Sequence, residues 1–260
     1  MRKCEYFAVT LQKFIPTHLN LIIDIGNNSA KLFLFNGEQI ILHTRKEGNF
    51  MELLTDWNKS YDIEKAIVST VVDIPAEQKK EIESYGYPVL WFNNKTPVPI
   101  GIKYRTPQTL GSDRVAAAVG AAGQVPGRNL MVIDAGSAIT IDIVDKEGNF
   151  VGGNIAPGVN MRFKALHAFT GRLPLIDQEG DTPTHGYDTE TAIRSGVIKG
   201  VCHEIDGYIN EFIEKNGDVF VFLTGGDEKT LINSIKNRIF ADRFLVAKGL
   251  NRILTHYDYK

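Results

Sequence analysis

The stretch LNLIIDIGNNSAKLFLFNG, residues 19–37, decides how this chain folds. Two apolar runs rich in β-branched residues flank the polar loop 24–29, and the stretch ends on Asn36-Gly37, a dipeptide typical of hairpin turns. The pattern predicts strand, turn, strand, and a third strand in EQIILHTR, residues 38–45. The polar loop is either a tight hairpin turn or a cradle for a phosphate group.

A second stretch, MVIDAGSAITIDIVDKEGNFVGG (131–153), repeats this pattern. Both stretches contain an apolar strand, an Asp-x-Gly turn, a second strand, a glycine turn and a third strand, and their aspartates, Asp24 and Asp134, lie 110 residues apart. We therefore predict an internal duplication that gives two α/β domains with a cleft between them. The expected division is an N-terminal extension 1–18, a first domain 19–125 and a second domain 126–260.

Periodicity and turn residues predict the remaining elements. The segment LGSDRVAAAVGAAGQV is expected to be a helix capped by Ser112, and a long helix is expected to start at Asp188 or Thr189. The other expected helices are 50–57, 75–86, 158–169 and 247–257, and the other expected strands are 65–72, 88–92 and 218–224.

Composition excludes several classes of protein. The net charge of −2 gives no reason to expect nucleic acid or an anionic membrane as a partner, and no window approaches the roughly 20 apolar residues of a membrane span. Two distant cysteines, Cys4 and Cys202, form no disulfide framework and fit a cytoplasmic location. The chain lacks the P-loop, dinucleotide, serine hydrolase, zinc protease and Cys-x-x-Cys motifs.

The two Asp-x-Gly turns are the main candidates for chemistry. In a purely structural interpretation, each aspartate accepts hydrogen bonds from the amides of its own turn. In a functional interpretation, the glycines let backbone N–H groups approach phosphate oxygens, and a carboxylate holds hydrated Mg²⁺. The duplication favours the second interpretation, with further donors in Asn27, Ser29, Ser137 and Thr140. Gly225-Gly226, after a third apolar strand, is expected to form a platform under the nucleotide.

The segment LGSDR (110–114) supplies an acceptor side for such a reaction. Asp113 falls in the first turn of a predicted helix, where an acidic residue is common for structural reasons alone. Arg114 beside it is less expected there. A carboxylate and a guanidinium facing a cleft can orient a substrate hydroxyl and bind a substrate carboxylate.

Together the segments DIGNNSAK, LGSDR, DAGSAIT, GGNIAPG and LTGGD resemble the motif series of the type III pantothenate kinases, in the superfamily of actin, acetate kinase and sugar kinases. The resemblance runs from about Leu19 to the C-terminal helix. It implies duplicated actin-like (ribonuclease H-like) domains, each a mixed sheet with helices. It also implies ATP-dependent phosphorylation of pantothenate to 4'-phosphopantothenate in coenzyme A biosynthesis, by a cytoplasmic homodimer.

The resemblance further implies roles for individual residues. Asp113 is expected to accept the proton of the pantothenate hydroxyl, Asp134 to bind K⁺ or NH₄⁺, and Asp24 to hold Mg²⁺ through water. The remaining pantothenate contacts are expected to be Tyr104, Gly111, Ser112, Arg114 and Thr189. The ATP contacts are expected to be Asp24, Ile25, Gly26, Asn27, Asn28, Ser29, Ala30, Lys31 and Ser137.

The chain departs from the family pattern at two positions. Asn28 stands where the family usually has threonine, and the second turn reads Gly-Ser-Ala in place of Gly-Thr-Ala. We expect altered nucleotide affinity from Asn28 and retention of the hydroxyl at Ser137. Three alternatives stay open at this point: another small-molecule kinase of the superfamily, a phosphohydrolase, and a non-catalytic nucleotide-binding regulator.

Overall fold

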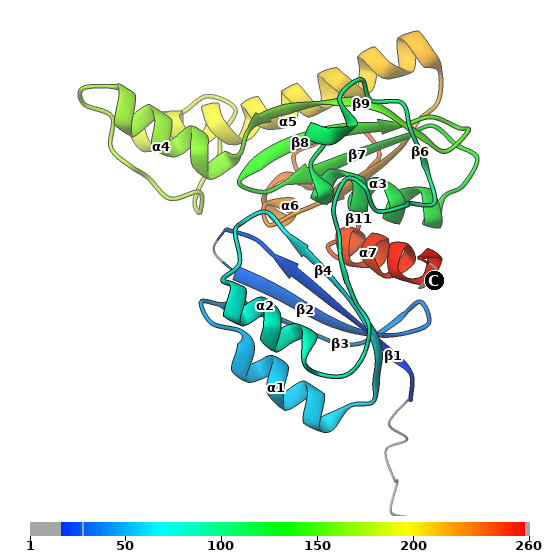
Figure 1. Ribbon diagram of the computed structural model, residues 1–260. Coiled ribbons are helices and arrows are strands. Elements are labelled where there is room, and N and C mark those ends of the chain that lie inside the picture. The colour runs from blue at the N-terminus through cyan, green and yellow to red at the C-terminus, as the bar shows by residue number, and fades with distance from the viewer. Residues whose placement is uncertain (1–16, 28, 258–260) are drawn as a thin grey trace, which may run out of the picture.

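The computed structural model describes residues 17–27 and 29–257 and contains two mixed β-sheets (Figure 1). The first sheet has the strand order β3-β2-β1-β4-β5 and consists of β1 (Leu19–Ile25), β2 (Ser29–Asn36), β3 (Gln39–Glu47), β4 (Ile63–Thr70) and β5 (Val89–Trp91). The second has the order β11-β10-β7-β8-β9-β6 and consists of β6 (Gly101–Ile102), β7 (Leu130–Ala135), β8 (Ala138–Val144), β9 (Asn149–Pro157), β10 (Phe220–Thr224) and β11 (Phe240–Ala241).

The topology of the two sheets confirms the predicted duplication. In the first sheet, β1, β2 and β3 form an antiparallel meander, and β4 and β5 add parallel strands on the other side of β1. In the second, β7, β8 and β9 form the same meander, and β10 and β11 take the places of β4 and β5. The added strand β6 pairs with β9. Each Asp-x-Gly turn therefore occupies the same position in its own sheet.

The helices form layers between and outside the sheets (Figure 1). They are α1 (Met51–Ser60), α2 (Ala76–Glu83), α3 (Ser112–Gln124), α4 (Val159–Phe169), α5 (Thr189–Asn216), α6 (Glu228–Leu231) and α7 (Leu245–His256), with the 3₁₀ turn η1 (Pro107–Thr109) ahead of α3. None of the helices in the described residues is both long enough and apolar enough to cross a membrane.

Three apolar cores hold the layers together. Alternate residues of β1 point to opposite faces, so Leu21 and Ile23 pack with α1 and α2, while Ile22 joins the core that contains α3 and α7. The other face of the second sheet packs against α5 and α4, with Ile133 and Val201 among its buried residues. The sequence of layers is α1 and α2, first sheet, α7 and α3, second sheet, α5.

Helices α3 and α7 cross between the sheets in backbone contact. A Cβ atom on Gly249 would lie 1.8 Å from the carbonyl oxygen of Ala116, and one on Gly120 would lie 2.3 Å from that of Leu245. Only glycine permits this approach at both positions. A buried hydrogen bond of 2.8 Å from Asn20 of β1 to Asn251 of α7 ties the pair of helices to the first sheet.

The structure differs from the sequence expectation in local details. Ser112 is the first residue of α3, and Gly111 before it makes no side-chain cap, so the predicted Ser112 cap is wrong. The expectation for α5 is confirmed, because the Asp188 carboxylate accepts the N–H of Thr191 at 2.8 Å in a reciprocal capping box. The domain limits 19–125 and 126–260 stay a prediction, although β6, at residues 101–102, joins the second sheet.

Candidate active site

The two Asp-x-Gly turns close in the same way. The Gly26 N–H donates to the carbonyl of Ser29 at 3.0 Å, and the Gly136 N–H donates to the carbonyl of Ala138 at 3.0 Å. Each turn follows the central strand of its sheet and leads into the antiparallel neighbour. Asn28 lies outside the described residues, so its expected effect on nucleotide affinity stays a prediction.

Strand register places a row of polar side chains across the first sheet. Asp24 lies opposite Ser69 of β4 on one side and Lys31 of β2 on the other, and Lys31 lies opposite Arg45 of β3. The Lys31 Nζ is 3.6 Å from the Asp24 Oδ2, and the Arg45 Nε donates to the Ser29 Oγ at 3.0 Å. Sequence reasoning missed Ser69 and Arg45, because their place depends on strand pairing.

The second sheet carries a corresponding row. Asp134 lies opposite Thr224 of β10 and Thr140 of β8, so each aspartate has a buried hydroxyl residue on its parallel neighbour. Ser69, its counterpart in the first sheet, is buried, and its hydroxyl finds no hydrogen-bond partner within the described residues. Asp142 lies two residues beyond Thr140 and therefore on the same face of β8.

The start of α3 presents Asp113. Its Oδ1 accepts the N–H of Arg114 at 2.8 Å, which folds the carboxylate back over the first turn of the helix. A Cβ atom on Gly111 would lie 2.5 Å from that oxygen, so the glycine makes room for this side-chain position. The predicted substrate residues Gly111, Ser112 and Asp113 therefore lie together, half-buried, at the start of α3.

The charges show that the aspartates share one region between the sheets. Burial, opposed by Lys31 and reinforced by Asp113, raises the pKa of Asp24 above its usual range. Burial raises the pKa of Asp134 to about 6, and the charges of Asp113, Asp24 and Asp142 add to this effect, while Lys31 opposes it. A region with this excess of carboxylate favours cations.

This carboxylate set fits the metal chemistry implied by the resemblance. Among the described residues, no three histidine, cysteine, aspartate or glutamate side chains converge on one point. Mg²⁺ is commonly held by one or two carboxylates together with phosphate oxygens and water, which Asp24 beside a nucleotide would provide. Within the part of the chain that the structure describes, Asp134 forms no ion pair, and the Lys31 charge only partly offsets its carboxylate, so a bound cation would neutralise it.

Arg114 takes a different position from the one expected. Its side chain is 6% exposed and forms an ion pair with Asp142, which is 1% exposed. The guanidinium carbon lies 5.8 Å from the ring centre of Tyr104 and 5.6 Å from that of Phe150. The structure thus brings the predicted substrate residues Tyr104 and Arg114 together, but places the guanidinium against β8 and not open to solvent.

The third glycine turn packs directly on the second Asp-x-Gly turn. Gly225 has a positive φ of 103°, and a Cβ atom there would lie 2.3 Å from the carbonyl oxygen of Ala135. The Asp227 N–H donates to the same carbonyl at 2.9 Å. Gly158 closes the other side, since its Cβ would lie 2.6 Å from the Ser137 oxygen. Ser137 itself is exposed at the tip of its turn.

Thr189 stands apart from the other predicted substrate residues. It is exposed at the first position of α5, and no hydrogen bond or ion pair among the described residues joins it to Asp113, Arg114 or Tyr104. Figure 1 shows that this end of α5 lies beside α4, on a part of the molecule that projects from the second sheet.

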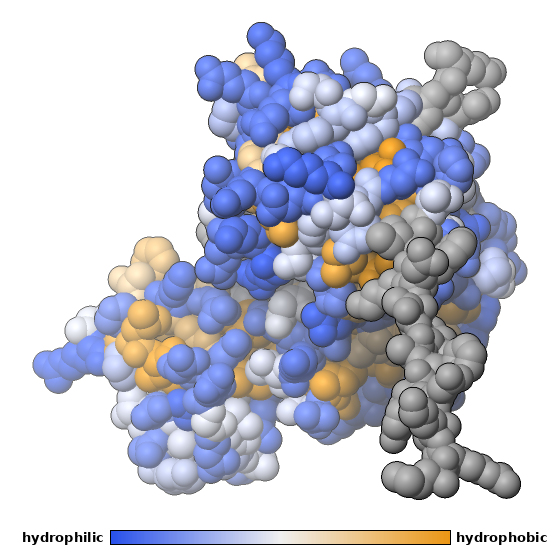
Figure 2. Space-filling view, turned by 90° about the horizontal axis from the view of Figure 1, so that it is seen from below, coloured by the Kyte–Doolittle hydropathy of each residue, from blue (hydrophilic) through white to orange (hydrophobic). Residues whose placement is uncertain are grey.

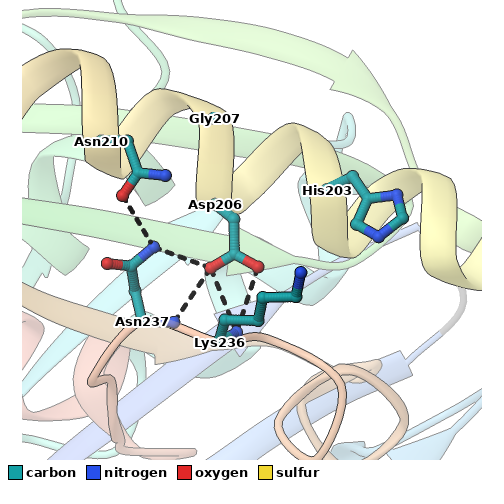
Figure 3. Close-up of a pocket in the computed structure, with 6 residues that line it drawn as sticks. All are labelled: His203, Asp206, Gly207, Asn210, Lys236 and Asn237. Atoms are coloured by element: carbon teal, nitrogen blue, oxygen red, sulfur yellow. Dashed lines mark hydrogen bonds between the residues drawn. The ribbon is translucent and has the colours of Figure 1, made fainter.

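A separate pocket lies between α5 and residues 236–237, and the contacts that line it are structural (Figure 3). The Asp206 carboxylate accepts the backbone N–H groups of Lys236 and Asn237 at 3.0 to 3.1 Å and the Asn237 side-chain amide at 2.8 Å. Burial acts to raise the pKa of Asp206, but these donors lower it overall. The carboxylate ties the chain after α6 to α5.

The chain is similar to known proteins over most of its length. The family model for type III pantothenate kinase matches residues 20–211. A type III pantothenate kinase of Bacteroides fragilis is 49% identical, with 92% of this chain and 98% of the relative covered, and that of Phocaeicola vulgatus is 43% identical, with 92% and 99% covered.

Solved structures share the fold. A ROK family glucokinase from Streptomyces griseus, crystallised with glucose and AMPPNP, superposes with a TM-score of 0.52 at 11% identity, covering 92% of this chain and 98% of the glucokinase. The activator of 2-hydroxyisocaproyl-CoA dehydratase from Clostridium difficile gives a TM-score of 0.52 at 13% identity, with 91% and 93% covered. The duplicated sheets match this fold, and the sequence relatives are more specific: the chain belongs to the type III pantothenate kinase family.

Proposed function

We propose that this protein transfers the γ-phosphoryl group of ATP to pantothenate and forms 4'-phosphopantothenate, the first step of coenzyme A biosynthesis. The observation that carries the proposal is the meeting of Asp24, Asp134 and Asp113 between the two sheets, in a chain of this family. In this proposal the two turns hold the phosphates and the start of α3 holds the acceptor.

In the proposed reaction, the pantothenate hydroxyl oxygen attacks the γ-phosphorus, the bond to the β–γ bridging oxygen breaks, and ADP leaves. Asp113 orients the hydroxyl and takes its proton. Phosphoryl transfer passes through a loose transition state in which positioning and charge neutralisation dominate. Lys31, whose Nζ lies 3.6 Å from the Asp24 Oδ2, would supply positive charge to the phosphates.

Cations complete the proposed site. Asp24 would hold Mg²⁺ through water, and Asp134 would hold K⁺ or NH₄⁺. These ions offset the charge of the triphosphate and of the carboxylates that burial has already made costly to ionise. The proposed ATP contacts are Asp24, Ile25, Gly26, Asn27, Asn28, Ser29, Ala30, Lys31 and Ser137. The proposed pantothenate contacts are Tyr104, Gly111, Ser112, Asp113 and Thr189, whereas Arg114, which the sequence also predicted as a contact, is ion-paired with Asp142.

We also propose a cytoplasmic homodimer. Large apolar side chains are exposed on the projecting part of the molecule around α4, and Figure 2 shows apolar surface on this part at the left. These side chains are Ile155, Met161, Phe169, Leu175 and Tyr187. Exposed apolar surface of this kind marks contact with another molecule. Thr189, exposed on the same part, would then lie near the subunit boundary. A measurement of the molar mass in solution tests whether the protein is a dimer.

A substrate panel tests the proposed reaction. ADP release is followed with pantothenate, acetate or glucose as acceptor, in K⁺, NH₄⁺ or Na⁺ buffers. We expect ADP release with pantothenate alone, faster in K⁺ or NH₄⁺ than in Na⁺. Release with another acceptor would indicate a different small-molecule kinase. Release without any acceptor would indicate a phosphohydrolase, and nucleotide binding without release would indicate a regulator.

A further inference from the structure

Arg114 and Asp142 form a buried, two-point ion pair. The Arg114 Nε lies 2.9 Å from the Asp142 Oδ1 and 3.2 Å from its Oδ2, and the Nη2 also donates to the Oδ1. Planar guanidinium and carboxylate groups that meet at two points are fixed in direction as well as in distance. The pair joins α3 to β8 across 28 residues of sequence.

The surroundings of the pair are closely packed. The rings of Tyr104 and Phe150 lie against the guanidinium and pack edge to face, 5.9 Å apart. Gly153 lies opposite Asp142 in the β8–β9 ladder. A Cβ atom on Gly153 would lie 2.2 Å from the Asp142 Oδ1 and 2.9 Å from the Arg114 Nη2. Two rings and a glycine thus enclose the pair.

This geometry changes the role that the sequence predicted for Arg114. Its charge is paired with Asp142, and its Nε and Nη2 are engaged, so the guanidinium offers little net charge to a substrate carboxylate. Arg114 directly follows Asp113, and its N–H holds the Asp113 Oδ1 at 2.8 Å. Fixing the Arg114 side chain against β8 therefore fixes the first turn of α3 and the direction of the Asp113 carboxylate.

We propose that Asp142 is a positioning residue for phosphoryl transfer: by holding Arg114 against β8, it sets the orientation of residues 111–114 and the place of Asp113 relative to the acceptor hydroxyl. This inference rests on the proposed function. In this account Asp142 affects the rate of phosphoryl transfer, and Arg114 holds Asp113 in position. Asp142 itself touches neither substrate nor nucleotide in this account.

The test compares three variants with the wild-type enzyme. Asp142→Asn keeps the side-chain size but removes the charge and turns one acceptor into a donor that faces the guanidinium. We expect kcat with pantothenate to fall about tenfold or more, a loss of the size that is typical when coupled neighbouring residues are changed. We expect KM for ATP to change by less than about twofold. Arg114→Ala is expected to lower kcat similarly. Both substitutions break the same ion pair. The kcat of the double variant Arg114→Ala/Asp142→Asn should therefore be no lower than that of Arg114→Ala alone.

The matched control is Asp218→Asn, which breaks an exposed arginine–aspartate pair with Arg128 and should leave the kinetics unchanged. Wild-type kcat in folded Asp142→Asn, or multiplied losses in the double variant, would overturn the inference. So would an Arg114→Ala enzyme that has normal kcat and only a raised KM for pantothenate. If Asp142→Asn does not fold, Arg114→Lys, which keeps the charge but lacks the planar fork, must show the loss of kcat. A wild-type enzyme without pantothenate-dependent ADP release would instead contradict the proposed function and this inference with it.

Discussion

Asp134, a proposed cation ligand, carries a cost in stability. Burial, despite Lys31, raises its pKa to about 6 from an ordinary value of 3.8. The folded protein therefore binds this proton more tightly than the unfolded chain does. The resulting stabilisation is complete below pH 3.8 and is lost as the pH rises through 6, so ionised Asp134 destabilises the cation-free protein at neutral pH.

Asp134→Asn should therefore stabilise the protein when no cation is bound. From a shift of about two pKa units, we expect a gain of about 3 kcal/mol at pH 7.5 and about 1 kcal/mol at pH 4.5 in the free energy of unfolding by urea, in buffer without K⁺, NH₄⁺ or Mg²⁺. Adding K⁺ should reduce the difference in the free energy of unfolding between Asp134→Asn and the wild type, because the ion stabilises only the wild type. An equal gain at both pH values, or a loss at pH 7.5, would contradict the assignment.

At the scale of residues, the site could be predicted where a motif is local in sequence. Asp24, Asp134 and Asp113 each belong to a short segment, and the structure brings the three together. The position of the Arg114 guanidinium could not be predicted, because its partner, Asp142, lies on another element. Ser69 and Arg45 were missed for the same reason, since only strand register places them beside Asp24 and Lys31. Sequence spacing carries no information about such neighbours.

At the scale of elements, the crossing of α3 and α7 joins the two sheets. Gly249→Ala would place a methyl group 1.8 Å from the Ala116 carbonyl oxygen. We expect a loss of about 1–3 kcal/mol in the free energy of unfolding, because overpacking outweighs the better helix propensity of alanine. The control is Gly200→Ala in α5, where a Cβ atom meets nothing within 4 Å and where a gain of up to about 1 kcal/mol is expected. Equal gains in both variants would contradict the backbone contact.

Elements with a clear apolar pattern could be predicted, and the shortest ones could not. The 28 residues of α5 and the two meanders follow from periodicity and turn residues. The two-residue strands β6 and β11 and the four-residue helix α6 were missed, because segments of that length have no period to detect. Ser112 was misplaced by one position, since Gly111 precedes the helix without a side-chain cap.

At the scale of the whole molecule, one unit used twice builds the site. The order 3-2-1-4-5 of the first sheet recurs in β7 to β11, and each copy contributes an Asp-x-Gly turn between its first two strands. The start of α3, the proposed acceptor site, carries Asp113, whose charge acts on both Asp24 and Asp134. The pairing of the two turns with the start of α3 is the central claim about function, and Asp113 is the residue on which it depends.

The direct measurement is kcat for ATP-dependent phosphorylation of pantothenate by Asp113→Asn beside the wild type, with urea unfolding of both to show that the variant is folded. The amide keeps the oxygen that accepts the Arg114 N–H but cannot take a proton. We predict a fall in kcat of about 10²- to 10⁴-fold, the usual contribution of general acid–base catalysis. Turnover close to that of the wild type would contradict the account.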